Sequence, residues 1–310
     1  MNIALTFDSS WARQARLSVF TAIASNRKSD LTFYLISDSL SNCDLDMFEL
    51  IRESACKDGG TRCVIKHIDI QSHADLLSGL PRTVPYVFME TRGKGDRNWA
   101  TIQGRGLEPE YKELPPVVGC PKEAYYRLVI PTLIAEERVL YLDTDALILK
   151  DISPLWNTVL GDKLVAGCPD IAVEQHRSHK KSIQIMPEEP YINAGVMLLN
   201  LRQIREERLD EKWLMMANDG ARRFKLCDQD IINVTTQQRK IILDPIYNAA
   251  FCTMQPPTYR QIAYFPEANI AIIHWAGMKP WDPRISVATP HYKIWKTKRL
   301  EYESVIKDEC

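Results

Sequence analysis

Short apolar runs alternate with amphipathic segments along the first 70 residues, and this alternation restricts the fold more than any other feature of the sequence. The predicted strands are residues 2–7, 31–36 and 63–70, and the predicted helices are residues 11–23 and 44–57. Strand–helix–strand–helix–strand order is typical of a parallel sheet with helices packed on its faces. Ligands of such sheets bind beyond the carboxyl ends of the strands, and Asp8 follows the first run at such a position.

Residues 81–121 interrupt this order because they are rich in glycine and proline and contain few sustained apolar runs. We interpret residues 71–121 as a loop-rich insertion rather than as a linker between domains. After the insertion the predicted helices are 122–131, 203–218 and 229–238, and the predicted strands are 138–142, 164–167, 196–199 and 269–273. The sequence therefore predicts an α/β fold with a mostly parallel central sheet, formed by residues 1–282 and followed by a helical C-terminal extension, residues 283–310.

The composition is that of an ordinary globular protein, with 45% apolar residues, 25% charged residues and a formal net charge of -1. This balance gives no reason to expect nucleic acid or an anionic membrane as the main partner. We find no secretory signal and no apolar run long enough to cross a bilayer, so we expect a cytoplasmic protein with reduced thiols at its eight cysteines. The basic residues of the tail, 291–310, have acidic neighbours and predict at most a peripheral contact with a membrane.

The sharpest chemical signal is Asp143-Thr144-Asp145, directly after the apolar run 138–142. In an extended segment alternate side chains share a face, so Asp143 and Asp145 are predicted to point one way and Thr144 the other. Two adjacent carboxylates repel each other unless a cation lies between them. The pair therefore predicts a site for magnesium or manganese, which in turn suit a diphosphate. A solvated strand end or a turn is the alternative interpretation of so short a pattern.

A second signal is the string from His274 to Trp281, which follows the predicted strand 269–273. The imidazole of His274 can complete a site with two aspartates, and it favours manganese over magnesium. Gly277 allows the backbone to approach a ligand closely, and Lys279 places a positive charge within reach of phosphate. A core histidine bonded to the backbone is the alternative for His274 taken alone.

Two further strings combine polar and small side chains. Asn193 can donate hydrogen bonds to sugar hydroxyls and accept them, while Ala194 and Gly195 leave room for a hexose ring. A turn that enters a buried strand explains this glycine equally well. In the second string Asp228 is a predicted N-cap of the helix 229–238. The group Asp228, Gln229 and Asp230 could equally face the hydroxyls and the reacting carbon of a sugar.

Together these strings resemble glycosyltransferase family 8, which includes bacterial lipopolysaccharide galactosyl- and glucosyltransferases and glycogenin. The segment Tyr125-Tyr126-Arg127-Leu128-Val129-Ile130-Pro131 also looks like a helix that precedes the paired aspartates in that family. The resemblance spans residues 1–282 in the expected order and is weakest over residues 71–121.

The resemblance implies a fold of the GT-A type, a UDP-hexose donor, manganese and retention of the anomeric configuration. By position, it implies metal ligands at Asp143, Asp145 and His274. The residues that it implies for donor binding are Asp8, Ser10, Trp11, Arg127, Thr144, Asn193, Ala194, Gly195, Asp228, Gln229, Gly277 and Lys279. Trp11 stands where a tyrosine usually stacks on uracil, and Lys279 follows Gly277 one residue sooner than in the pattern of the family.

A metal ion and Lys279 would stabilise the negative charge that grows on the departing diphosphate. Gln229 and Asp230 are our candidates on the reacting face of the sugar, beside Asp228. We expect transfer of galactose or glucose from a UDP-sugar to a glycan or lipid-linked glycan, with the 71–121 insertion on the acceptor side; a protein acceptor is the alternative. A nucleotidyltransferase is less favoured because the loop after the first strand is not glycine-rich, and an inactive sugar-nucleotide-binding protein is less favoured because the metal ligands are intact.

Overall fold

The structure, a computed structural model, describes most of the chain. The described residues are 1–56, 62–80, 83–84, 117–118, 120–175, 177–219, 224–250, 269–277, 279–281 and 290–307. Most of the predicted insertion, residues 71–121, lies outside them. In that region the structure describes η2 (Ile70–Ser72), α3 (Ala74–Ser78) and the paired strands β4 (Thr83–Val84) and β5 (Val117–Val118).

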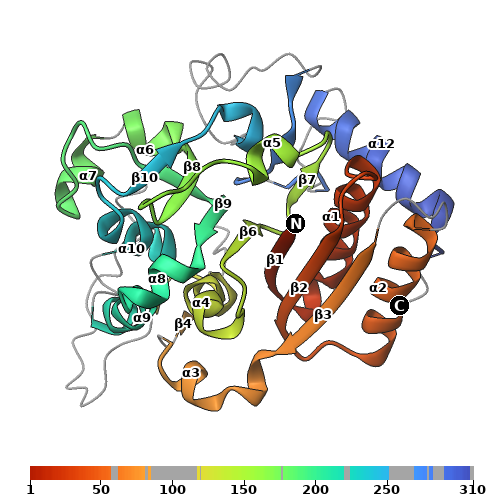
Figure 1. The fold of residues 1–310 in the computed structure, drawn as a ribbon, viewed down its shortest axis with the longest axis horizontal. Helices are drawn as coiled ribbons and strands as arrows, with labels where there is room; N and C mark the ends of the chain where they lie inside the picture. The colour runs from red at the N-terminus through yellow and green to blue at the C-terminus, as the bar shows by residue number, and fades with distance from the viewer. Residues whose placement is uncertain are drawn as a thin grey trace, which may run out of the picture.

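A seven-stranded sheet forms the centre of the molecule, with the strand order β10-β8-β9-β6-β1-β2-β3 (Figure 1). Its strands are β1 (Asn2–Asp8), β2 (Leu31–Asp38), β3 (Cys63–Asp69), β6 (Arg138–Leu142), β8 (Val165–Pro169), β9 (Ile192–Asn200) and β10 (Lys240–Ile242). β9 is antiparallel to its neighbours β6 and β8, and the other pairings are parallel. The start of β9 therefore lies at the same edge as the carboxyl ends of β1, β6 and β8.

Side chains alternate between the two faces of this sheet, and each face has its own apolar core. On β1, for example, Ile3, Leu5 and Phe7 join one core and Ala4 joins the other. The first core also contains residues of α1 (Ala12–Ser25), α2 (Asn42–Ala55) and α12 (Pro290–Val305). The second contains residues of η4 (Lys122–Val129), α4 (Ile130–Leu133), α8 (Leu201–Glu206), α9 (Leu209–Asp219) and α10 (Cys227–Thr235). The predicted α/β fold, with a mostly parallel sheet and helices on both faces, is confirmed.

A smaller sheet of three strands is connected to the central sheet where the chain passes from β6 to β7. It has the order β11 (Ala249–Ala250), β12 (Ile272–His274) and β7 (Ala146–Ile148). β7 follows β6 after a three-residue connection, and β12 runs antiparallel to β7 with His274 opposite Ala146. This register brings a histidine from far along the chain to the connection that holds the paired aspartates.

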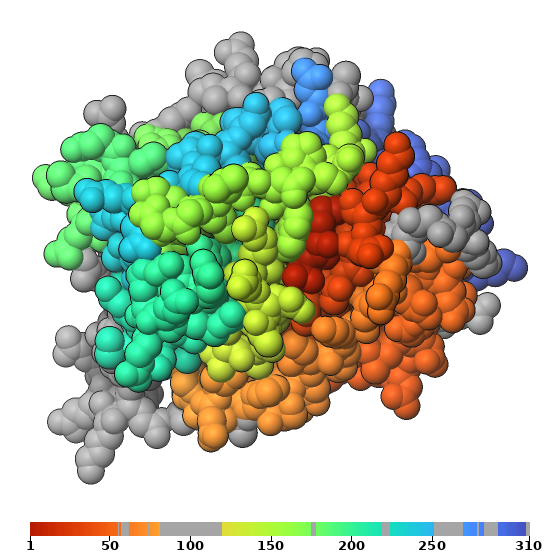
Figure 2. Space-filling model, viewed as in Figure 1, coloured from red at the N-terminus to blue at the C-terminus, as the bar shows by residue number. Residues whose placement is uncertain are grey.

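Helix α12 belongs to the first core rather than standing apart from it. Trp295 and Tyr302 are buried, and the Tyr302 ring meets the Phe20 ring of α1 edge-on at 5.6 Å between centroids. In the space-filling view the first 80 residues form one side of the molecule, residues 138–250 form the other, and α12 lies along the edge of the first (Figure 2). Among the residues that the structure describes, no helix combines the length and the apolar composition that a bilayer crossing requires.

Two of the predicted helices differ from the structure in more than the position of their ends. The expected helix 203–218 is divided into α8 and α9, because Arg208 adopts a left-handed backbone conformation with a φ of 51°. The segment from Lys122 is a 3-10 helix through Val129, and the Arg127 Nε atom donates to the carbonyl of Ala124 at 3.0 Å. The remaining short helices are η1 (Ser9–Trp11), α5 (Ser153–Trp156), α6 (Ile171–Gln175), α7 (Arg177–Ser182) and η5 (Pro245–Asn248).

Candidate active site

The paired aspartates lie in a tight turn between β6 and β7, not on an extended strand. Asp143 directly follows β6, and the Ala146 backbone N–H donates to the Asp143 carbonyl at 3.0 Å, which closes a four-residue turn. The reason predicted for their convergence, that alternate side chains of a strand share one face, is therefore wrong. They converge nonetheless: one oxygen from each of Asp143 and Asp145 and one ring nitrogen of His274 lie within 4.8 Å of one another.

These three ligand atoms form a site that suits a cation. His274 Nε2 lies 3.3 Å from Asp145 Oδ1 and 3.6 Å from Asp143 Oδ2. Asp145 Oδ1 is buried and accepts no hydrogen bond from any residue that the structure describes. Burial opposes ionisation of Asp145, but the positive charge of Lys279, the largest opposing effect, helps to hold the pKa of the carboxyl below its usual range. Two carboxylates and an imidazole with an unpaired buried oxygen between them are a fitting donor set for a divalent metal.

Gly195 is required at this site because it leaves space for the ligands themselves. A Cβ atom built on Gly195 would lie 2.7 Å from Asp143 Oδ2 and closer still to the His274 ring. The Gly195 carbonyl also accepts the backbone N–H of Asp143 at 2.8 Å, so the two backbones are locked together. This contact is a reason for the glycine besides the predicted room for a hexose ring, which stays a prediction.

Arg127 connects the aspartate turn to two other elements. Its Nη2 donates to Asp143 Oδ1 at 2.9 Å, its Nη1 donates to the Ala194 carbonyl at 2.8 Å, and its Nε lies 3.0 Å from Asp228 Oδ2. Tyr141, under the guanidinium at 4.4 Å, also donates to Asp143 Oδ1, at 2.7 Å. Asp143 Oδ1 is therefore occupied, which leaves Oδ2 for a cation. Burial lowers the pKa of Arg127, but Asp143 and Asp228 outweigh it, and the net pKa is raised.

Strand β9 and helix α10 are joined by the side chain of Gln229. Its Oε1 accepts the backbone N–H of Ala194 at 2.9 Å, and its Nε2 donates to Asp170 Oδ2 at 3.1 Å. Asn193 Nδ2 donates to the same Asp170 oxygen at 3.1 Å. Asp170, which the sequence analysis missed, directly follows β8. The sequence contained a signal for Asp170, because Asp8 and Asp143 likewise stand at the carboxyl ends of buried strands: Asp8 is the last residue of β1, and Asp143 directly follows β6.

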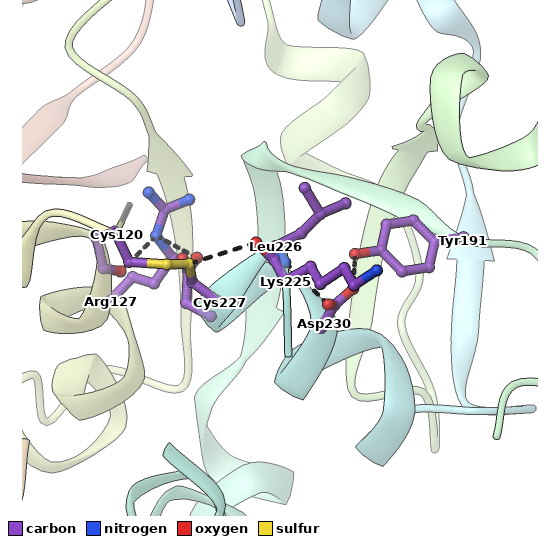
Figure 3. The surroundings of a disulfide bond; sticks show 9 residues. Cys120, Arg127, Tyr191, Lys225, Leu226, Cys227 and Asp230 are labelled. Carbon is purple, nitrogen blue, oxygen red and sulfur yellow. Dashed lines mark hydrogen bonds and ion pairs between the residues drawn. A yellow bond between two sulfur atoms is a disulfide. The ribbon is translucent and has the colours of Figure 1, made fainter. Parts of the chain in front are cut away.

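The structure separates the two acids that flank Gln229. Asp228 is not an N-cap, since α10 begins at Cys227 after Leu226, and its carboxylate faces Arg127 instead. Asp230 is fully buried and points away from Arg127 (Figure 3). Its Oδ1 accepts from Tyr191 Oη at 2.5 Å and lies 2.7 Å from His179 Nε2, while its Oδ2 accepts the backbone N–H of Leu226 at 2.9 Å. Asp230 thus anchors α10 to α7 and to Tyr191, which directly precedes β9.

The predicted nucleotide-contacting segment adjoins the metal ligands through aromatic rings. Asp8 Oδ1 accepts from the Ser10 backbone N–H at 2.8 Å and from Ser10 Oγ at 2.5 Å, which shapes the turn after β1. The Trp11 ring packs edge-on against Trp281 at 5.8 Å, and Lys279 Nζ lies 5.7 Å from the Trp11 ring centre.

Lys279 lies directly beside the predicted metal ligands despite the shortened spacing after Gly277. It donates to Asp145 Oδ2 and to the Trp275 carbonyl, the latter at 2.8 Å. Gly277 is partly exposed in the bend before it. Thr144 is nearly buried, and its carbonyl accepts from Ser18 Oγ at 2.9 Å. The structure thus brings the N-terminal segment, the aspartate turn and the 274–281 string together.

A disulfide joins Cys120 to Cys227 and connects the segment before η4 to the start of α10 (Figure 3). The Cα atoms are 6.3 Å apart, within the range for disulfides, and the two residues are 107 positions apart in sequence. Cys43 is also disulfide-bonded. The expectation of uniformly reduced thiols is therefore wrong, because local spacing does not reveal pairs that only the fold brings together. Cys63 and Cys168 are free thiols, and burial raises the pKa of each to about 12.

The sequence matches the profile of a known family over nearly its whole length. The profile, "Glycosyl transferase family 8", covers residues 2–284. General stress protein A of Bacillus subtilis is 33% identical over 173 residues, which are 52% of this chain and 59% of that protein. The lipopolysaccharide 1,2-glucosyltransferase of Escherichia coli is 24% identical over 319 residues, which are 99% of this chain and 82% of that protein.

Solved structures show the same fold. The galactosyltransferase LgtC, in complex with donor and acceptor sugar analogs, superimposes with a TM-score of 0.66 at 20% identity, covering 99% of this chain and 100% of that one. The glycosyltransferase GlyE of Streptococcus pneumoniae gives a TM-score of 0.63 at 17% identity, over 98% of this chain and 62% of that one. The fold is that of the GT-A glycosyltransferases. Fold, metal-binding group and profile agree: the chain is a glycosyltransferase, and it belongs to glycosyl transferase family 8.

Proposed function

We propose that the protein transfers a hexose, galactose or glucose, from a UDP-sugar to a glycan or lipid-linked glycan, with retention of the anomeric configuration. The observation that carries this proposal is the convergence of Asp143, Asp145 and His274 beside Lys279 at the edge of the sheet. Relatives named as lipopolysaccharide 1,2-glucosyltransferase and 1,3-galactosyltransferase support a hexose donor and a glycan acceptor.

Asp143, Asp145 and His274 would hold the metal ion, for which we propose Mn²⁺, with Mg²⁺ as the second choice because of the imidazole ligand. A bound divalent ion supplies positive charge against the diphosphate as it departs. Lys279 adds a positive charge of the chain's own at the same place. Because it donates to Asp145, it is held within reach of any anion that this site binds.

The residues around the site divide between the two ends of the donor. We propose that Asp8, Ser10 and Trp11 contact the nucleotide, with the Trp11 ring as the stacking surface, and that Gly277 gives backbone access beside the phosphates. Arg127, Thr144, Asn193, Ala194, Gly195 and Asp228 would surround the sugar. The buried Arg127 supports this arrangement because one guanidinium fixes the aspartate turn, β9 and Asp228 relative to one another.

Gln229 is our proposal for the group nearest the reacting carbon. Its Oε1 accepts one hydrogen bond, from Ala194, and so retains a lone pair that can stabilise positive charge on a sugar ring. Asp170 holds the amide in this orientation. Asp230 would act through the position of α10, since both of its oxygens are engaged by Tyr191, His179 and Leu226.

The sequence predictions about location and domain roles stay proposals. We propose that residues 71–121 contribute to the acceptor side and that α12 makes at most peripheral membrane contact. A cytoplasmic location stays a proposal that the Cys120–Cys227 disulfide does not support, because disulfides are rare in reducing compartments. The charges of α12 support a weak contact, because Lys298 and Arg299 are paired with Glu301 and Glu303 on the same helix.

Chelation is expected to stop the reaction. With a panel of UDP-sugars, UDP release should occur with UDP-galactose or UDP-glucose, fall to background in EDTA and return best with Mn²⁺ rather than Mg²⁺. Activity that is indifferent to EDTA would overturn the metal assignment. Turnover of a nucleoside triphosphate instead of a UDP-sugar would favour the nucleotidyltransferase interpretation.

Acid is expected to lower activity through Asp228. Burial, together with Asp143, raises the pKa of Asp228 to about 6 against the opposing effect of Arg127. Above this pH the carboxylate is ionised and paired with Arg127; at pH 5 about a tenth remains ionised, so kcat/KM should be about tenfold lower than at pH 7. Because the folded-state pKa is raised, protonation of Asp228 favours the folded state as the pH falls, so this loss is not unfolding.

Circular dichroism across the same pH range checks that the fold persists. The Asp228→Asn variant should be less active at pH 7, and its kcat/KM should not show this fall between pH 7 and pH 5. If kcat/KM of that variant falls with pH as in the unsubstituted protein, the titration belongs to another group.

A further inference from the structure

Two buried side-chain amides connect a backbone N–H group, which can only donate a hydrogen bond, to the ring of His274. The backbone N–H of Gly195 can only donate, and it donates to Asn193 Oδ1 at 3.0 Å. On the other side of the same amide, Asn193 Nδ2 donates to the carboxylate of Asp170, which as an ion can only accept. The oxygen and nitrogen of the Asn193 side chain are thus fixed by two independent partners.

The fixed order of donors and acceptors continues through the side chain of Asn248, a residue that the sequence analysis did not single out. Asn248 is 5% exposed and ends η5, next to β11. Its Nδ2 donates to Asn193 Oδ1 at 2.9 Å, and because that oxygen is an acceptor, the atom that faces it must be the nitrogen. Asn248 Oδ1 then faces His274 Nδ1 at 3.0 Å, and because Oδ1 can only accept, Nδ1 must carry the proton.

A neutral imidazole protonated on Nδ1 presents a lone pair on Nε2. That atom is the one that lies 3.3 Å from Asp145 Oδ1 and 3.6 Å from Asp143 Oδ2. We propose that Asn248 is a positioning residue that fixes the tautomer and ring orientation of His274, with its own polarity set by Asn193. The inference rests on the proposed metal site, and it goes beyond it by naming the group that prepares His274 to be a ligand.

The test compares Asn248→Leu, which removes the acceptor at nearly the same size, with Asn248→Asp, which keeps an acceptor opposite Nδ1. The first readout is the ¹⁵N spectrum of labelled histidine at pH 8, with the His274 signals assigned from their absence in His274→Gln. The second is Mn²⁺ binding in the absence of nucleotide, measured from the EPR signal of the free ion. Thermal unfolding of each variant confirms that it is folded.

In the unsubstituted protein we expect the proton on Nδ1. Asn248→Asp should keep that tautomer, because it keeps the acceptor opposite Nδ1, and should bind Mn²⁺ more tightly than Asn248→Leu even though it loses the donor to Asn193 Oδ1. Asn248→Leu should show mixed tautomers and about 10- to 100-fold weaker Mn²⁺ binding than the unsubstituted protein. A proton on Nε2 in the unsubstituted protein, or an unchanged tautomer in Asn248→Leu, would overturn the proposal. If the tautomers behave as expected but the unsubstituted protein binds no Mn²⁺, the metal assignment of the proposed function fails and the assignment of Asn248 stands.

Discussion

Asp145→Asn is expected to reduce transfer by about a thousandfold while leaving the protein folded. The substitution keeps the shape of the side chain and removes the charge from the group that Lys279 and His274 both face. Without that charge, the site loses affinity for a cation and part of its stabilisation of a departing diphosphate. Lys279 retains its hydrogen bond to the Trp275 carbonyl and is partly exposed, so its loss of a partner should cost little stability.

Asp46→Asn is a matched control because Asp46 is exposed on α2. That variant should retain full activity. Both variants are assayed for UDP release at saturating Mn²⁺, and their thermal unfolding is compared with that of the unsubstituted protein. Turnover of Asp145→Asn within a few-fold of the unsubstituted rate would remove Asp145 from the metal site and with it the central proposal.

The sheet, and the three residues that converge as a possible metal-binding group, could be predicted from the sequence because both depend on local patterns. Apolar runs of strand length predicted β1, β2, β3 and β6 nearly to the residue. The acids after these runs marked the ligand-binding edge. Strand β9 was predicted, but its antiparallel direction was not, since direction depends on which neighbours it pairs with.

The support of the site could not be predicted, because it depends on contacts between distant elements. Asn248 reaches His274 only after η5 and β12 are placed side by side, and no local pattern surrounds it. The role of Gly195 likewise follows from the position of the His274 ring. Asp230 stood in a motif that suggested chemistry, yet its partners, one on α7 and one directly before β9, show a buried anchor. Sequence motifs thus located the residues, and tertiary contacts decided what each one faces.

Arg127→Met should have the second large effect, on stability as well as on activity. It would leave Asp143 and Asp228 without their shared buried cation and leave the Ala194 carbonyl without a donor. Loss of one partner from a buried charge network costs about 3–5 kcal/mol, so the free energy of unfolding should fall by about that amount in chemical denaturation. Transfer should fall to background, because the aspartate turn and β9 are no longer held together.

A double-mutant cycle tests whether the charges themselves are responsible. Asp228→Asn in the Arg127→Met background removes one uncompensated carboxylate and should recover part of the lost stability, whereas the same change in the unsubstituted protein should raise stability less, because Arg127 there offsets part of the cost of burying this charge. Arg208→Met is the control, because its pair with Glu211 is exposed and should contribute little to stability. Equal effects of Asp228→Asn in both backgrounds would show that Arg127 stabilises the site by packing alone.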